Sequence, residues 1–244
     1  MNKKTCVVSA CAAALLISMP LIGRSAQVIG DTHSLLNTAS ANQLESWLGQ
    51  GPVTLNNIFS KKIGDRKNSN TFHNAADGQG PPFTVMDVAV NSAHQIVGGY
   101  DLQSGSTIGN WNLTFSDSQR TAFLFNLTSS VRQNQPPSTA PSGLEDTGFY
   151  QTSNDAGGPA FGGGFDLAAY VSDLEQGYAS QYSYGGNGIL FGGVNILCGT
   201  GVQIFPIASM EVFTIAVVPE APPYRLMLLL PLVAGTLRIL HERK

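Results

Sequence analysis

The stretch GGPAFGGGFDLAAY, residues 157–170, carries five glycines in its first eight positions and then alternates between apolar and other side chains. A dinucleotide-binding loop needs a glycine six positions into its motif and opens a helix, and a P-loop needs Gly-Lys before Ser or Thr. Leu167 or Ala168 stands where that last glycine should be, and no lysine lies nearby. The glycines therefore predict a bend or bulge that feeds a strand, where another backbone can approach closely.

The rest of the body is patterned mainly for strands. A short helix is predicted over residues 38–49, with Gly49 as its stop. Period-two alternation predicts strands, the first two of which form a hairpin; they cover residues 83–90, 96–101, 121–128, 165–171, 189–196 and 209–218. The polar, proline-containing residues 129–155 are interpreted as a long surface loop. The fold class predicted is mainly β, an antiparallel sandwich with short helices on its outside.

Five stretches together resemble TLDc domains. They are TFHNAADGQGPPFTVMDV (71–88), IVGGYD (96–101), TAFLFNLT (121–128), GPAFGGGFDLAAY (158–170) and IASMEVFTI (207–215). They follow the family's order and span about residues 38–217. The resemblance implies a two-sheet β-sandwich flanked by helices.

The N-terminus is patterned for export. Lys3 and Lys4 precede an uncharged run to Ile22, which is typical of a secretory signal peptide over residues 1–26, with cleavage by signal peptidase at Ala26. A lipoprotein box ending at Cys11 is the alternative, but it leaves a very short apolar region after Lys4.

The C-terminus, residues 219–244, combines a Pro-Glu motif, an apolar run and a basic end. The run over 226–237 covers about 18 Å of a hydrocarbon core that is about 30 Å thick. Residues 217–244 resemble the PEP-CTERM sorting tail, although alanine follows Pro219-Glu220 where the family usually has proline. The resemblance implies recognition of Pro219 and Glu220 by an exosortase, and the basic residues Arg238 and Arg243 stay cytoplasmic while the body is outside. An ordinary short membrane anchor is the alternative.

The body between these ends, residues 27–218, is long enough for one domain with a core. It holds six basic and fourteen acidic residues, so its net charge is near −8. This charge argues against nucleic acid and anionic lipid surfaces as partners. Cys198 is its one cysteine, which excludes an intramolecular disulfide in the body.

Candidate site residues are few, and no motif for a metal or a cofactor is present. Glu211 shares a face with Phe213 and is the first catalytic candidate; on a core face its pKa would rise through desolvation. Asp166 is the second catalytic candidate and shares with Tyr170 a face that we expect to point outward, where the pair could contact a sugar. His73, in the TFHNAADG turn, is a further ligand-binding candidate.

Four of the six basic residues of the body lie within seven positions: Lys61, Lys62, Arg66 and Lys67. We interpret this group as a solvated turn, with contact to an acidic polymer as the alternative.

Three functions are consistent with these patterns. The first is a non-enzymatic binding module that is anchored at the inner membrane by its tail and delivered to the cell envelope or the exopolysaccharide matrix, with extracellular polysaccharide as its partner. The second is an envelope hydrolase that uses Asp166 and Glu211 as acid and base. The third is protection from oxidants, for which Cys198 lacks a resolving partner in the same chain.

Overall fold

The computed structural model describes residues 25–30, 35–90, 92–138, 147–154, 157–180, 182–184 and 204–219. The described helices are α1 (Thr38–Leu48), α2 (Ser69–Ala76) and the short 3-10 helix η1 (Asp117–Gln119). The described strands are β1 (Gln27–Ile29), β2 (Val53–Lys62), β3 (Pro82–Val90), β4 (Ala93–Tyr100), β5 (Asn110–Leu113), β6 (Phe123–Asn126), β7 (Val131–Asn134), β8 (Tyr150–Asn154), β9 (Ala160–Phe161), β10 (Leu167–Ala169), β11 (Gln176–Tyr178) and β12 (Ile204–Val217). The prediction of a mainly antiparallel β fold with short helices is confirmed.

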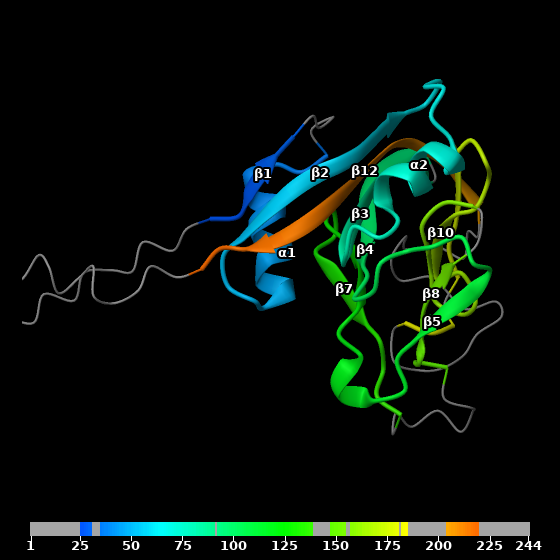
Figure 1. Cartoon of the computed structure of the whole chain (residues 1–244). Helices are drawn as coiled ribbons and strands as arrows, with labels where there is room; N and C mark the ends of the chain where they lie inside the picture. The colour runs from blue at the N-terminus through cyan, green and yellow to red at the C-terminus, as the bar shows by residue number, and fades with distance from the viewer. Residues whose placement is uncertain are drawn as a thin grey trace, which may run out of the picture.

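Strand β12 links two groups of strands (Figure 1). Along most of its length it lies between β2 and β3, in the order β1-β2-β12-β3-β4-β6-β7. Its first residues, Ile204 to Pro206, pair instead with β11, which begins the second group in the order β11-β10-β9-β8-β5. Every described pair is antiparallel except β1 with β2.

Two hydrophobic clusters cover opposite faces of the first group. Successive side chains of a strand point to opposite faces, so Val85 and Met86 of β3 enter different clusters. The Val85 cluster packs against α1, whose Leu44 is fully buried. The Met86 cluster packs against Phe72 of α2 and residues of β9, β10 and β12. The second group of strands and α2 thus lie on the face opposite α1.

Helix α1 forms where the sequence predicts it. The side chain of Asn37 accepts a hydrogen bond from the Ser40 N–H at the N-terminus, and the Gly49 N–H bonds to the Glu45 carbonyl at the other end. Helix α2 was not predicted, because its polar sequence, SNTFHNAA, has few apolar positions. A capping box between Asn68 and Thr71 and the burial of Phe72 and Ala76, four residues apart, stabilise it.

The predicted hairpin of residues 83–90 and 96–101 is confirmed as β3 and β4, with Phe83 opposite Tyr100. The prediction of a loop over 129–155 is wrong in part, because β7 and β8 lie within it. Their residues are mostly polar, so composition alone indicates a loop. The strands form because β7 pairs with β6, and β8 pairs with β5 and β9, which gives their backbone groups hydrogen-bond partners. The strand predicted at 189–196 lies outside the described residues.

The glycine stretch bends the chain into strand β10, as predicted, and the bend is the turn of a short hairpin. Strands β9 and β10 pair with Phe161 opposite Leu167, and the turn between them contains Gly162, whose φ is +76°. A Cβ at Gly162 would overlap the carboxylate of Asp166, and one at Gly164 would lie 2.6 Å from the Cβ of Tyr182. The absent side chains therefore let the chain around residue 182 pack against the turn.

Within the described residues, no helix has both the length and the apolar character needed to cross a membrane. The apolar run of the predicted tail, 226–237, and the predicted signal segment before Arg24 lie outside them.

Substitution of Gly162 by alanine tests the turn against a matched glycine. Gly109 has a similar φ of +73° but open space where its Cβ would be, so Gly109→Ala should cost only the left-handed strain, about 1–2 kcal/mol. Gly162→Ala should cost about 3 kcal/mol or more, because the methyl group also displaces a buried carboxylate from its donors. Urea-unfolding midpoints measure both; equal losses would show that the contact with Asp166 is unimportant.

Candidate functional site

A small cavity of about 40 Å³ lies where α2, the end of β4 and strands β8 and β9 meet. Polar side chains on its wall include His73, Asp77, Asp101 and Asn154, and Phe161 and Val212 contribute apolar surface. The volume accommodates a few water molecules or a very small ligand, and it is too small for a sugar ring.

Asp101 is the most perturbed acid of this cavity. It follows β4 directly, and its Oδ1 accepts hydrogen bonds from the Gln103 N–H at 2.9 Å and from Gln151 Nε2 at 2.7 Å. Burial raises the pKa of Asp101 to about 7, and these bonds together with one from the Thr152 side chain only partly oppose the rise. The carboxyl group therefore changes charge near neutral pH.

His73 lies in the last turn of α2, not in the turn that the sequence suggested. Its Nδ1 is 3.0 Å from Asp77 Oδ1, and its Nε2 is 2.8 Å from the carbonyl oxygen of Gly157. Both ring nitrogens lie within hydrogen-bonding distance of acceptor oxygens. The ring thus fastens α2 to the start of the glycine stretch, and neither nitrogen is left to act as a base.

A ladder of amides fixes the segment before β5 to β8. Asn154 Oδ1 accepts from the Ser106 N–H at 3.1 Å, and Asn154 Nδ2 donates to Asn110 and Asn112 at 3.0 and 2.9 Å. Asn112 Nδ2 in turn donates to the Thr152 hydroxyl at 2.9 Å. These neutral groups satisfy one another, so this side of the cavity is rigid.

Asp166 does not lie on an outward face with Tyr170; that prediction is wrong. Asp166 is 1% exposed, and its carboxylate accepts the backbone N–H groups of Tyr182, Ser183 and Tyr184 at 2.8–3.0 Å. Burial raises the pKa of Asp166 to about 6, against the opposing effect of these bonds. The alternation fails because β10 begins only at Leu167 and all three of its side chains are buried.

Glu211 is fully buried at 0% exposure, on the face of β12 that also carries Phe213, as predicted. It is opposite Ser60 on β2 and Val85 on β3. The next residue, Val212, reaches the cavity from the other face, so Glu211 points away from it. The structure therefore does not bring Glu211 and Asp101 into one site.

Tyr170 is 42% exposed, and its hydroxyl donates to Gln176 Oε1 at 3.3 Å. Its ring meets that of Tyr178 edge to face, with centroids 6.3 Å apart. Tyr170 does not belong to the cavity wall.

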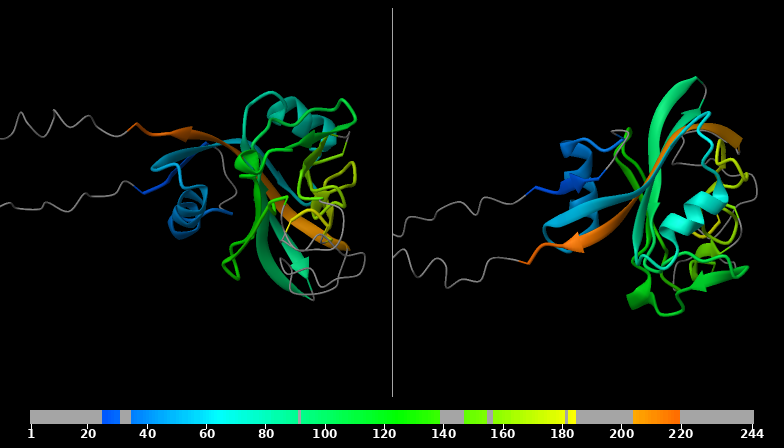
Figure 2. Two further views of the ribbon diagram at one scale, coloured as in Figure 1. Left: turned by 90° about the horizontal axis from the view of Figure 1, so that it is seen from below. Right: turned by 45° about the horizontal axis from the view of Figure 1, so that its top comes forward.

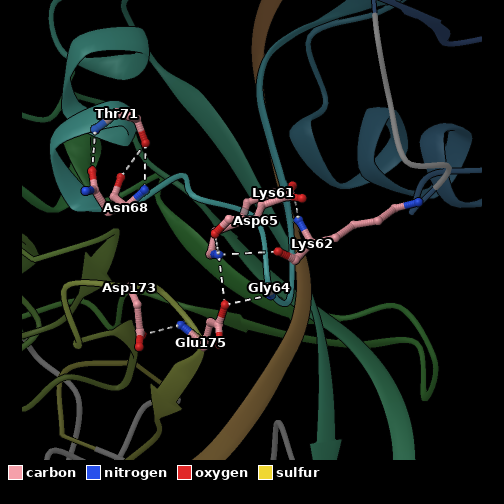
Figure 3. Close-up of polar contacts among 8 residues, drawn as sticks. All are labelled: Lys61, Lys62, Gly64, Asp65, Asn68, Thr71, Asp173 and Glu175. Atoms are coloured by element: carbon pink, nitrogen blue, oxygen red, sulfur yellow. Dashed lines mark hydrogen bonds and ion pairs between the residues drawn. The ribbon is translucent and has the colours of Figure 1, made fainter.

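The basic group near residue 61 is not a uniformly solvated turn, which corrects that interpretation (Figure 3). Lys61 is 2% exposed, and its Nζ donates to Glu175 Oε1 and to the Asp65 carbonyl, both at 3.1 Å. The Gly64 N–H donates to the same Glu175 oxygen at 2.8 Å. These bonds lower the pKa of Glu175 and tie the loop before α2 to the segment before β11. Lys62 and Arg66 remain exposed.

The residues predicted to take part in processing lie at or beyond the ends of the described residues. Ala26 is buried, and its N–H donates to Asn42 Oδ1 at 3.0 Å, whereas Pro219 is exposed just after β12. Glu220, Arg238, Arg243 and Cys198 lie outside the described residues. Their predicted roles stay predictions.

No protein-family model matches this sequence, and no curated protein matches it. The part of the chain that the structure describes holds no cluster of three or more histidine, cysteine, aspartate or glutamate side chains suited to a metal ion. Chemically, the cavity offers one carboxyl group that changes charge near neutral pH and a set of neutral hydrogen-bonding groups already bonded to one another.

Sequence reasoning missed Asp101, although a signal was present. An acidic residue that ends an otherwise apolar strand, IVGGYD, is unusual unless polar groups form hydrogen bonds with it. The side chains that bond to it, those of Gln151 and Thr152, lie about fifty positions away in a segment whose polar composition indicates a loop.

Asp101→Asn should change how stability depends on pH. The folded-state pKa lies above the unfolded one, so the stability that Asp101 contributes is complete below about pH 4 and is lost as the pH rises through 7. Asparagine stays neutral, and its oxygen can keep both bonds to Oδ1. From pH 5 to pH 8.5 the variant should therefore gain about 2 kcal/mol relative to the parent chain.

Urea unfolding at the two pH values measures this change. Asp117→Asn is the control of opposite sign, since hydrogen bonds from the backbone and hydroxyl of Ser138 lower the pKa of that exposed carboxyl group. It should show no gain at pH 8.5. A stability difference for Asp101→Asn that is constant with pH would mean that Asp101 is ionised throughout in the folded state.

Proposed function

We propose that the chain is an exported, non-enzymatic binding module of the TLDc type, held at the cell envelope by its C-terminal tail, with extracellular polysaccharide as its ligand. In this proposal the two strand groups joined by β12 are the two layers of a TLDc-type sandwich. The hydrophobic cluster that includes Met86 of β3 and Leu167 of β10 supports this assignment, because it draws residues from both groups.

The burial of the two candidate carboxylates carries the choice of a binding module over a hydrolase. A glycosidase needs its acid and its second carboxylate beside the scissile bond. Asp166 is 1% exposed with its oxygens taken by backbone N–H groups, and Glu211 is 0% exposed within the sheet. A polymer chain has no access to either group.

The cavity also argues against hydrolysis at this place. Its volume of about 40 Å³ leaves no room for a sugar and an attacking water together. Both nitrogens of His73 are engaged, by Asp77 and by Gly157, so the ring does not provide a free base.

The positions of the chain ends support attachment through one end of the body. Gln27 of β1 and Ala216 of β12 both lie opposite Thr54, on either side of β2. Two strand spacings separate them, about 10 Å. Both predicted processing segments therefore adjoin the same end of the sheet, and a tail held in the membrane leaves the other end of the body free (Figure 1).

Intact mass of the protein isolated from the envelope tests the export part of this proposal. We expect a chain that begins after Ala26, with the tail beyond Glu220 either removed or retained as an anchor. Recovery of the full 244-residue chain from the cytosol would contradict export.

Binding to native exopolysaccharide tests the ligand. The full chain, held in lipid nanodiscs, should bind the polysaccharide saturably and release no new reducing ends over prolonged incubation. Glu211→Gln provides the matched control, since it should lower stability and leave binding by the folded fraction unchanged. Fragment release that disappears in Glu211→Gln or Asp166→Asn would instead establish the hydrolase.

A further inference from the structure

Five aromatic rings form a continuous row along β5, β8 and the glycine turn. Neighbouring centroids are 4.3–6.1 Å apart in the order Phe115, Phe149, Tyr150, Trp111 and Phe165. We call these five residues the aromatic row. They come from three segments of the sequence, so the fold brings them together.

The aromatic row is accessible from solvent. Phe115 is 70% exposed, and the other four residues are half-buried. Phe115 stacks nearly parallel on Phe149, with an angle of 22° between the rings. A connected set of partly exposed rings is uncommon on a soluble surface, where exposed apolar groups are usually scattered, and it marks an interaction site.

The row is held rigidly from beneath. Strand β5 pairs with β8, and the bonds among Asn112, Thr152 and Asn154 lock the two strands together. Gly163 packs against Tyr150, since a Cβ there would lie 2.8 Å from the ring. The backbone that carries the rings is therefore fixed by contacts within the fold.

The two segments that carry four of the five rings are polar but uncharged. Residues 102–116 and 147–154 contain no acidic or basic side chain. Two acidic residues adjoin the row in sequence: Asp166 follows Phe165 and is buried, and Asp117 is bonded to Ser138 and lies 3.5 Å from Arg120. Amide and hydroxyl groups around aromatic faces suit a neutral polymer of hydroxyl groups, whose C–H groups pack on the negative face of each ring.

The row also lies far from the first and the last described residues of the body. The views in Figures 1 and 2 place β5 and β8 away from β1 and from the last residues of β12. With the body attached through its ends, as the proposed function requires, this surface faces away from the membrane. The net charge of the body, near −8, disfavours an acidic polymer.

We infer that the aromatic row is a binding surface for a neutral polysaccharide, with sugar rings stacked on Trp111 and Phe115. This inference rests on the proposed function and adds the surface and the class of polysaccharide.

The two tryptophans of the chain allow a direct test. Trp47 packs near Phe125 on the α1 side, so Trp47→Phe leaves Trp111 as the one tryptophan, which excitation at the red edge of its absorption band reports selectively over tyrosine. The full chain in nanodiscs is titrated with cellohexaose, laminarihexaose and maltohexaose, and with an alginate oligosaccharide as the acidic comparison. We expect a saturable change in Trp111 emission with at least one neutral probe and a much weaker one with alginate.

Variants then locate the surface. Phe115→Ala removes an exposed ring at little cost in stability and should weaken binding about tenfold. Tyr170→Ala is the matched control, an exposed aromatic residue outside the row, and should leave the affinity unchanged. Trp111→Ala, followed by calorimetry instead of fluorescence, should weaken binding at least as much as Phe115→Ala.

The outcomes separate this inference from the proposed function. Binding of native exopolysaccharide that is lost in Tyr170→Ala and kept in Phe115→Ala overturns the row as the site and leaves the proposed function standing. Failure of every neutral probe also overturns the inference, whereas failure to bind the native polysaccharide overturns the proposed function itself. The native matrix can also be treated before the capture experiment. If the chain still captures material after periodate oxidation of the matrix and captures none after protease treatment, the ligand of the row is a protein, which contradicts our inference.

Discussion

The central constraint on this fold is that a single strand, β12, is hydrogen-bonded to three others. It lies between β2 and β3 for most of its length, and its first three residues pair with β11. Because successive side chains alternate, Val212 supports the cluster under α2 and Phe213 supports the cluster under α1. The position of the second strand group, and with it the cavity and the aromatic row, follows from where β12 leaves β2 and turns to β11.

Buried polar groups then fix the loops that strand pairing alone leaves open. Asp166 bonds three successive backbone N–H groups, His73 joins α2 to Gly157, and Lys61 joins the loop before α2 to Glu175. Each bond links segments that are distant in sequence. Such groups are costly to bury without partners and stabilise a unique arrangement when they are satisfied. This structural role accounts for Asp166, which the sequence suggested as a catalytic residue.

Much of the fold was predictable from local sequence, and the site was not. The hairpin of β3 and β4 and helix α1 carry clear periodicity and stop signals, and the glycines indicate the bend before β10. Strand β8 was missed because YQTSN has no apolar alternation. Asp101 and the aromatic row were missed for a related reason, since their neighbours are brought together only by the pairing of β5 with β8 and of β8 with β9.

The place of β12 in the chain has a consequence for how the protein matures. The strand that pairs with β2, β3 and β11 is the last described strand of the chain, so these pairings can close only after the residues of β12 have been synthesised. Contacts between residues so far apart in sequence form slowly. The β3–β4 hairpin is local and can form first, so the pairings of β12 with β2 and β11 complete the sheet last.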